Sequence, residues 1–466
     1  MRANGDSKSL STLPPTLDDD GFPSIGRPQV NDAGEETFAS SFYRGGTDWS
    51  HLVSTEDGPG NGAVADRDSE KRLRQTSLFR IWGLKRKEAD DPEGCASSSF
   101  SLSPKRTKTS SDPALLTRAG DRPRACPFYK KMPGTPFTVD AFRYGRVEGC
   151  TAYFLTHFHA DHYGGLSKKW SHGPIYCTPL TTRLVKMCLY VDPLLIHSLE
   201  LNEEYVIEGV RVTLLEANHC PGAALILFCL QNGQHYLHTG DFRASRSMQS
   251  HPLLLNNQVD VLYLDTTYCN PRYRFPAKED VLNYVVKITR NFLKRHPKTL
   301  VVVGAYSIGK ECVYLTISKA LGVKIHANSS RRRILNSFNW PELSDSVTSN
   351  PKETFLHVLP ISSLRLENLS KYLKENKDRY TEVLAFRPTG WTYSEKIGVH
   401  LDLIKPNSKG NVTIYGVPYS EHSSYTELRE FVQFLRPKKI IPTVNVSNAS
   451  GREKMQSYFR EWLRDT

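Results

Sequence analysis

The stretch of sequence that decides the fold is His157-Phe158-His159-Ala160-Asp161-His162, where four side chains that can bind a metal fall within six residues. At the end of a strand, His157 and His159 project to the same side, because side chains alternate along a strand. If the chain then turns into a helix, Asp161 and His162 face the same point from another direction. Imidazole and carboxylate ligands suit zinc with one position open for water. A histidine-rich loop without metal is the alternative, but this spacing seldom arises by chance, so we predict a metal site.

Two positions further along the chain are candidates to complete this site, because each follows an expected strand. His219 comes after the alternating segment 204–216, and Asp241 comes after a predicted hairpin that turns at Asn232-Gly233. Taken singly, His219 is better explained as a loop histidine, and Asp241 as a turn or cap residue. Together with the first cluster, they form a set large enough to hold two metal ions.

The length and charge of the chain bound its class. A chain of 466 residues is too long to fold around one compact hydrophobic core, and it is long enough for two domains and a tail. The formal net charge of +12 suits a polyanionic partner, because lysines and arginines bound to phosphates release counterions, although solubility alone is the alternative explanation. The polar start and the lack of an apolar run near about 20 residues argue against a secretory signal or a membrane span. The nine scattered cysteines fit a reducing, intracellular compartment.

Residues 1–120 are rich in Ser, Gly, Asp and Pro and have few periodic apolar positions, so we predict a disordered tail. Its basic clusters at 85–87 and 105–108 resemble a two-part nuclear import signal, with scattered surface charge as the alternative. A short apolar island resembles the peptide that docks on sliding clamps, although one expected aromatic residue is missing and a chance match explains it equally well. The residues that would make this clamp contact are Gln75, Leu78, Ile81 and Trp82.

From Cys126 onward the sequence alternates between strand-like and helix-like segments, which predicts an α/β fold with mixed sheets and helices on their faces. Ser424 and Glu427 have the spacing of a capping box, which marks a helix start. The expected strands cover 149–158, 204–216, 223–230, 235–239, 259–264, 300–304, 411–415 and 440–446, and the expected helices cover 313–321 and 424–435.

The segment from Gly304 to Glu311 nearly matches a phosphate-binding loop, since it follows a strand and opens a helix. Its last position holds Glu311, where a nucleotide-binding loop has the Ser or Thr that binds magnesium. A carboxylate there repels a triphosphate, which argues against nucleotide hydrolysis. The glycines instead let the backbone approach a DNA phosphate, or they cap the helix.

These residues together resemble the metallo-β-lactamase superfamily, whose pattern is His-x-His-x-Asp-His followed by a distant His and a distant Asp. Segments 264–268, 420–424 and 442–446 resemble the extra motifs of the β-CASP branch, which processes nucleic acids. The stretch from Cys126 to Leu463 resembles the 5′-exonucleases of DNA interstrand cross-link repair, the sensitive-to-nitrogen-mustard family. Segments similar to that family are also found at 137–142, 307–311 and 387–391.

The resemblance implies a fold and its boundaries. It predicts an αββα metallo-β-lactamase sandwich over 121–266 and again over 412–466. An α/β β-CASP domain would be inserted between these segments, over 267–411. DNA would then lie in the cleft between the two domains.

The resemblance also implies roles for the residues at matching positions. A first zinc would be held by His157, His159 and His219, a second by Asp161 and His162, and Asp241 would bridge the two. Asp140 would support the site from behind the ligands, Asp265 is the acid of an extra motif, and His422 would lie near the scissile phosphate. The candidate catalytic residues are therefore Asp140, Asp161, Asp265 and His422, and the cofactor would be one zinc ion or two.

Ser420 and Ser423 are candidates to hold a terminal 5′-phosphate, because they flank His422 just before a predicted helix. Hydroxyls, free amides and the helix dipole at such a place favour an anion. Plain capping of the helix by Ser423 or Ser424 explains the local pattern equally well. The family resemblance favours the phosphate pocket.

The resemblance implies a nuclear, monomeric, zinc-dependent enzyme that degrades DNA from 5′-phosphate ends in the 5′-to-3′ direction during cross-link repair. Val444 stands where RNA-processing members of the branch have a histidine, which favours DNA. An RNA-processing endonuclease of the same branch and a non-catalytic repair scaffold remain the alternatives. Further candidate DNA contacts are Tyr268, Lys310 and the arginines at 331–333, although surface charge is the default explanation for the arginines.

Overall fold

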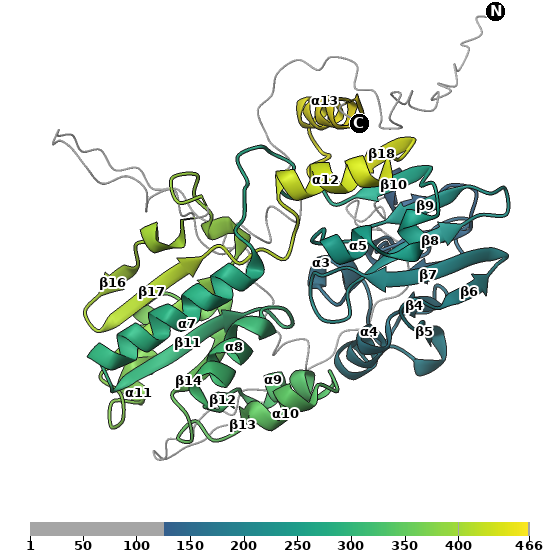
Figure 1. The fold of residues 1–466 in the computed structure, drawn as a ribbon. Coiled ribbons are helices and arrows are strands. Elements are labelled where there is room, and N and C mark those ends of the chain that lie inside the picture. Colours follow the sequence, from purple (N-terminus) through teal and green to yellow (C-terminus); the bar gives the residue numbers. More distant parts are fainter. Residues whose placement is uncertain (1–124, 399, 465–466) are drawn as a thin grey trace, which may run out of the picture. The chain divides into compact units, whose positions relative to one another are not determined.

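The structure, a computed structural model, describes residues 125–398 and 400–464. The predicted disordered tail over 1–120, with its import-like clusters and its clamp-like peptide, lies outside the described residues. Within the described ranges, no helix combines the length and the apolar composition that a membrane span needs. This part of the chain is mixed α/β, as predicted, with three sheets and helices packed against them (Figure 1).

Two of the sheets belong to the predicted sandwich. The first contains, in spatial order, β1 (Lys131–Met132), β2 (Phe137–Val139), β3 (Ala152–Phe154), β4 (Ile175–Cys177) and β5 (Ile196–Ser198), and β2 to β5 are parallel. The second contains, in spatial order, β18 (Lys439–Pro442), β10 (Val261–Leu264), β9 (His235–His238), β8 (Ala224–Cys229), β7 (Val210–Glu216) and β6 (Glu204–Ile207). Neighbours are antiparallel from β6 to β9 and parallel from β9 to β18.

These two sheets pack face to face through apolar side chains. The ring centroids of Phe137 on β2 and Phe154 on β3 lie 5.2 Å apart. Phe228 on β8 crosses between the sheets, with its centroid 5.9 Å from Phe137 and 5.2 Å from Phe154. Val212 on β7 and Tyr263 on β10 are buried in the same cluster. Inner faces that interdigitate in this way make the core of a sandwich.

Helices accompany the sandwich at several of its edges. α4 (Pro179–Leu184) packs near β5, and α13 (Ala449–Arg464) packs on β18 and on α12 (Tyr425–Leu435). The short α3 (Ala160–Tyr163) follows the loop after β3. The shorter helices α5 (Arg246–Gln249) and α6 (Pro252–Leu255) lie between β9 and β10 in the chain.

The third sheet has seven strands, and six of them lie in the segment 267–411 that the sequence predicts as an inserted domain. Its spatial order is β13 (Val347–Thr348), β12 (Ile325–His326), β14 (Leu356–Pro360), β11 (Thr299–Ala305), β15 (Glu382–Pro388), β17 (Val412–Val417) and β16 (Asn407–Lys409). Only the pairing of β16 with β17 is antiparallel. β11 is buried along its whole length, which explains its unbroken apolar run. The helices of this segment are α7 (Lys278–Arg295), α8 (Glu311–Leu321), α9 (Ser329–Asn336), α10 (Pro341–Ser346) and α11 (Leu366–Glu375).

The predicted hairpin and the predicted helix start are both confirmed. β8 and β9 pair antiparallel on either side of Gly233, whose φ of +81° suits a residue without a Cβ atom. α12 begins after Ser424, and the predicted capping box is complete: the Ser424 hydroxyl accepts the Glu427 N–H, and the Glu427 carboxylate accepts the Ser424 N–H.

Two strand predictions were too long. Segment 204–216 forms β6 and β7, because Glu208 and Gly209 have φ values of +46° and +76° and reverse the chain. The apolar alternation runs through this turn, and Val206 is 69% exposed as a result. The strand expected over 149–158 is reduced to β3, so His157 and His159 lie in the loop before α3 and not on a strand, and His162 lies within α3.

The predicted boundary between 411 and 412 also falls in a different place. β17 pairs with β15 and β16, and therefore belongs to the seven-stranded sheet. The sequence assigned this strand to the closing part of the sandwich. In the structure the elements that pack with the sandwich resume at α12.

Candidate metal centre

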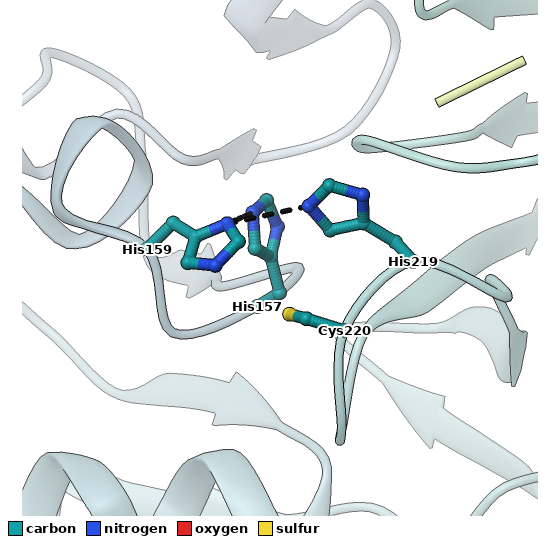
Figure 2. Close-up of side chains that lie close together, drawn as sticks. All are labelled: His157, His159, His219 and Cys220. Carbon is teal, nitrogen blue, oxygen red and sulfur yellow. Dashed lines mark hydrogen bonds between the residues drawn. The ribbon is translucent and has the colours of Figure 1, made fainter. Parts of the chain in front are cut away.

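Three histidines from two loops point one nitrogen each at a common position. The Nδ1 atom of His159 lies 2.9 Å from Nε2 of His157 and 3.2 Å from Nε2 of His219 (Figure 2). The sulfur of Cys220 faces the same position, and these four ligand atoms all lie within 4.8 Å of one another. His157 and His219 are buried, and His159 is half-buried. Such a cluster of nitrogen and sulfur donors suits zinc.

A second group of ligand atoms lies beside the first, and Asp241 borders both. The Oδ2 atom of Asp241 lies 3.2 Å from Nε2 of His162 and 3.7 Å from Nε2 of His157. It also lies 3.9 Å from Nε2 of His219. Asp161 completes the second group, with Oδ2 3.6 Å from Nε2 of His162. The structure therefore brings together all six residues that the sequence predicted as ligands.

The other ring nitrogen of each histidine has a partner behind the cluster. These contacts are His157 Nδ1 to Thr156 Oγ1 at 3.0 Å, His162 Nδ1 to Asp140 Oδ2 at 2.7 Å, His219 Nδ1 to the Glu421 carbonyl at 2.8 Å, and His159 Nε2 to the Ile308 carbonyl at 3.3 Å. Such partners fix the tautomer and the orientation of a ligand imidazole. The rings are thus oriented as ligands by the protein itself.

Asp140 supports the cluster and is not one of its ligands. It is buried, and its two oxygens accept hydrogen bonds from the Thr156 amide at 2.9 Å and the Thr156 hydroxyl at 2.7 Å. Burial opposes the charge of this carboxylate, but His162 and Lys130 outweigh that effect and hold the pKa of Asp140 below its ordinary value. A carboxylate therefore faces Nδ1 of His162.

Charges around the second group also favour an ionised Asp241. Burial alone would raise the pKa of this aspartate, but the neighbouring His162, His422 and His157 hold it well below the ordinary value. An ionised carboxylate between His162 and the three imidazoles of the first group is suited to be shared by two metal ions.

His422 and Asp265 form a pair at the edge of the cluster. His422 Nδ1 lies 2.8 Å from Asp265 Oδ2, and the other carboxylate oxygen accepts bonds from the amide and hydroxyl of Thr267 at 2.9 and 2.6 Å. The His422 ring centroid is 4.7 Å from that of His219. Burial disfavours protonation of His422, but the Asp265 carboxylate outweighs burial and raises the pKa of His422.

The hydroxyls of Ser420 and Ser423 are engaged within the protein. Ser420 Oγ donates to the His422 carbonyl at 2.8 Å and accepts the His422 amide at 3.1 Å. Ser423 Oγ donates to the Phe242 carbonyl at 3.1 Å and accepts the Ala244 amide at 2.9 Å. Because a hydroxyl has one proton to donate, neither side chain can donate to a phosphate in this conformation. Helix capping belongs to Ser424.

Lys310 and Tyr268 are buried rather than displayed to a ligand. Lys310 is 5% exposed, and its ammonium forms an ion pair with the Glu421 carboxylate, which also accepts the Lys310 amide at 3.0 Å. Burial would raise the pKa of Glu421, but Lys310 outweighs it and lowers that pKa to about 2. Tyr268 lies among Tyr273 and Phe275, with ring centroids 4.7 and 4.8 Å away.

Two residues of this site were not found from the sequence. Cys220 directly follows His219, and only the fold shows that its sulfur turns toward the histidines. Glu421 lies inside the segment that was singled out for Ser420 and His422, but its link between His219 and Lys310 joins positions 202 and 111 residues away in the chain. No local pattern carries that signal.

Comparison with known proteins shows extensive similarity to DNA repair proteins. The chain is 62% identical over 451 residues to the DNA cross-link repair protein SNM1 of Arabidopsis thaliana, and the match covers 92% of this chain and 91% of that protein. It is 51% identical over 343 residues to the human DNA cross-link repair 1A protein, covering 74% of this chain but 33% of that longer protein. It is 35% identical over 314 residues to the 5′ exonuclease Apollo of Gallus gallus, covering 67% of this chain and 63% of that protein.

A family match agrees with these relatives. Residues 341–448 match the family described as DNA repair metallo-beta-lactamase, a stretch that includes β17, α12 and His422. The clustered His and Asp side chains, the two-sheet sandwich and the near full-length similarity to the plant protein all agree. The chain belongs to the SNM1 family of DNA cross-link repair proteins, within the metallo-β-lactamase/β-CASP superfamily.

Proposed function

We propose that this protein is a zinc-dependent DNA exonuclease that degrades strands in the 5′-to-3′ direction from 5′-phosphate ends during the repair of interstrand cross-links. One observation carries the proposal: six candidate ligands lie in two adjoining groups, and Asp241 borders both of them. Paired metal sites of this kind serve the hydrolysis of phosphodiesters. The relatives named for cross-link repair and for 5′-exonuclease activity support the substrate and the direction.

The residues present fit zinc at both positions. His157, His159 and His219 would hold the first ion, Asp161 and His162 the second, and Asp241 would touch both. Imidazole and carboxylate donors with fixed outer contacts are typical of catalytic zinc sites. Bound zinc would supply a water of lowered pKa and neutralise charge on the phosphate.

The residues around the ligands have separate tasks in this proposal. Asp265 holds Nδ1 of His422, so that the opposite ring edge is presented to the substrate. The raised pKa of His422 favours a protonated ring, which can donate a proton to the departing oxygen or bind the phosphate. Asp140 keeps Nε2 of His162 directed at the second group.

The choice of DNA over RNA rests on Val444. The Val444 carbonyl accepts a hydrogen bond from the Thr266 hydroxyl at 2.6 Å, which holds the backbone at this position. The valine side chain has no atom that could bind a metal. An RNA-processing endonuclease of the same branch is the alternative. A non-catalytic scaffold is a weaker alternative, because every expected ligand position is occupied by a residue that can bind metal.

The proposal is tested by digestion of end-labelled strands. Single-stranded DNA with a 5′-phosphate should shorten stepwise from that end, the same strand with a 5′-hydroxyl should be a much poorer substrate, and matched RNA should resist. Equal rates on both DNA ends would remove the 5′-phosphate requirement. Internal cuts in RNA would favour the endonuclease alternative.

We also propose a nuclear location, a monomeric state and a contact with a sliding clamp through Gln75, Leu78, Ile81 and Trp82. Removal of residues 1–120 should leave cleavage intact while reducing nuclear accumulation and clamp binding. Replacing Leu78 and Trp82 by alanine should affect clamp binding alone. Unchanged clamp binding in that double variant would reject the proposed contact.

A further inference from the structure

Trp391 is a large aromatic side chain that remains substantially exposed. It lies on the 3₁₀ turn Gly390–Thr392, which follows β15, and it is 48% exposed. Its ring is nevertheless in contact with the protein on one side, because its centroid lies 5.2 Å from that of the buried Tyr268. One side of the indole is therefore held by Tyr268, while about half of the residue's surface remains exposed.

The turn that carries Trp391 is held closely. A Cβ atom on Gly390 would lie 2.6 Å from the Tyr268 hydroxyl, so only glycine lets the turn approach this tyrosine. The Thr389 hydroxyl accepts the Trp391 amide at 3.4 Å, and the Thr392 hydroxyl donates to the Thr389 carbonyl at 2.8 Å. The backbone under Trp391 is thus anchored at both ends, which limits the ordering cost when a ligand stacks on the ring.

Trp391 ends a row of rings that begins at the candidate metal centre. The Tyr268 centroid lies 5.8 Å from that of His422, which in turn lies 4.7 Å from that of His219. Tyr268 is supported from behind by Tyr273 and Phe275. The exposed indole is therefore two ring contacts away from His422.

Exposed cations accompany this aromatic cluster. Along 272–275, Arg272 and Arg274 are exposed whereas Tyr273 and Phe275 are buried. The Arg272 guanidinium lies 4.5 Å from the centroid of the Tyr273 ring. Exposed arginines on the segment that supports Tyr268, together with the half-exposed Trp391, match a ligand that has both phosphates and flat bases.

We propose that Trp391 is a stacking platform for a nucleobase of the substrate strand, close to the nucleotide whose phosphate reaches the metal centre. This inference rests on the proposed nuclease function and assigns it a base-contacting residue. Stacking accepts every base, because each has a flat π-face, so Trp391 adds affinity and position without sequence preference. The exposed arginines provide attraction for the backbone.

The test compares Trp391→Ala and Trp391→Phe with a control at a second exposed tryptophan. Trp340 is 37% exposed and contacts Phe338 at the start of α10, so Trp340→Ala removes a similar ring elsewhere. For single-stranded DNA, Trp391→Ala should raise KM about ten-fold and change kcat much less, as expected for the loss of one stacked base. Trp391→Phe should recover most of the affinity, and Trp340→Ala should match the unaltered protein.

Strands with abasic nucleotides near the 5′ end identify the stacked partner. On such strands the KM of the unaltered protein should rise by about the same factor, about ten-fold. The KM of Trp391→Ala should be no higher on abasic strands than on normal strands. An unchanged KM for Trp391→Ala on normal DNA would overturn the platform, and so would equal losses from the variant on normal and abasic strands. The latter result would point to a protein or backbone contact.

The two proposals fail in distinguishable ways. If the unaltered protein cleaves no strand, the nuclease function is wrong. Quenching of tryptophan fluorescence by an oligonucleotide, measured on Asp241→Asn with and without Trp391→Ala, then still tests the platform. Quenching of the same amplitude with and without Trp391 would reject it.

Discussion

The sandwich and the seven-stranded sheet contribute to the candidate centre in different ways. The six predicted ligands come from loops of the sandwich and from the short helix α3, whereas His422 lies in the connection between β17 of the seven-stranded sheet and α12. Within the described residues, the turn after β11 contacts the ligands in two ways. The Ile308 carbonyl contacts His159, and Lys310 pairs with Glu421, whose carbonyl contacts His219. The comparison shows that the sandwich carries the candidate metal ligands, whereas the seven-stranded sheet helps to hold those ligands in position. Substitutions can therefore disturb metal binding and ligand positioning separately.

The largest effect should come from the ligand that borders both groups. Asp241→Asn removes the charge between His157 and His162, and we expect metal loss and a fall in cleavage of at least about 1,000-fold. Elemental analysis and cleavage rates would measure this. Asp260→Asn is the matched control, because Asp260 is also largely buried but pairs with Lys438 away from the centre. Zinc retention by Asp241→Asn would remove it from the ligand set.

A smaller effect should come from the side of the seven-stranded sheet. Lys310→Met leaves the Glu421 carboxylate without its ion-pair partner, which should loosen the Glu421 carbonyl on His219. We expect a loss of about 10- to 100-fold in zinc affinity or kcat, the usual cost of disturbing a partner of a metal ligand. Lys319→Met is the control, since Lys319 lies on α8, the helix that Lys310 precedes, and pairs with Glu342 at the surface.

The same variant separates alignment from DNA binding. If Lys310 bound a phosphate, its loss would reduce the slope of log affinity against log salt by about 0.7 for a single strand. The buried ion pair predicts an unchanged slope with weaker metal binding. A changed slope with normal zinc content would restore Lys310 as a DNA contact.

Ser420 should give an effect of about ten-fold. If its hydroxyl holds the loop around His422, as its two hydrogen bonds suggest, Ser420→Ala lowers the rate equally on 5′-phosphate and 5′-hydroxyl ends. If the hydroxyl binds the terminal phosphate, the variant loses rate only on 5′-phosphate ends. The ratio of rates on the two ends therefore distinguishes the two roles.

The smallest effect concerns stability alone. Burial, with a contribution from Glu421, raises the pKa of Glu311 from 4.5 to about 7, and one of its carboxylate oxygens has no hydrogen-bond partner. The folded state then holds this proton more tightly than the unfolded state, so stability is lost as pH rises from 4.5 to about 7. Glu311→Gln should be more stable at pH 8 by up to about 3 kcal/mol and equal near pH 4.5.

Denaturant unfolding at both pH values measures this difference. Each variant is compared with the unaltered protein at the same pH, so titration of the histidines cancels. A gain that is the same at both pH values would mean that packing, not charge, separates Glu311 from Gln. Lower stability at pH 8 would show that the carboxylate is stabilising.

The sequence predicted what depends on short patterns. The capping box at Ser424, the hairpin at Gly233 and the class of the fold follow from neighbouring residues, and the structure has them. The pattern failed at Glu208 and Gly209, because apolar alternation continued through a reverse turn. Apolar alternation predicts which face of a strand is buried, but it does not predict where the chain reverses direction.

In the candidate site, too, features made by neighbouring residues were predicted, and contacts between distant residues were not. The cluster from His157 to His162 was visible because its members are neighbours, and the expected strand ends indicated His219 and Asp241, to which the resemblance then gave roles. The ion pair of Lys310 with Glu421 was missed, because a lone lysine in a glycine-rich turn gives no indication of a carboxylate 111 residues away. Ligand chemistry was therefore predictable, and the contacts that align it were not.

Zinc titration of the chelated protein tests the central claim most directly. The metal content and the cleavage of a 5′-phosphorylated strand would be followed in the same samples, with Asp241→Asn treated in parallel. We predict that chelation abolishes cleavage and that activity returns in proportion to zinc bound, in the unaltered protein only. Full cleavage after complete removal of metal, or equal recovery in Asp241→Asn, would contradict the account.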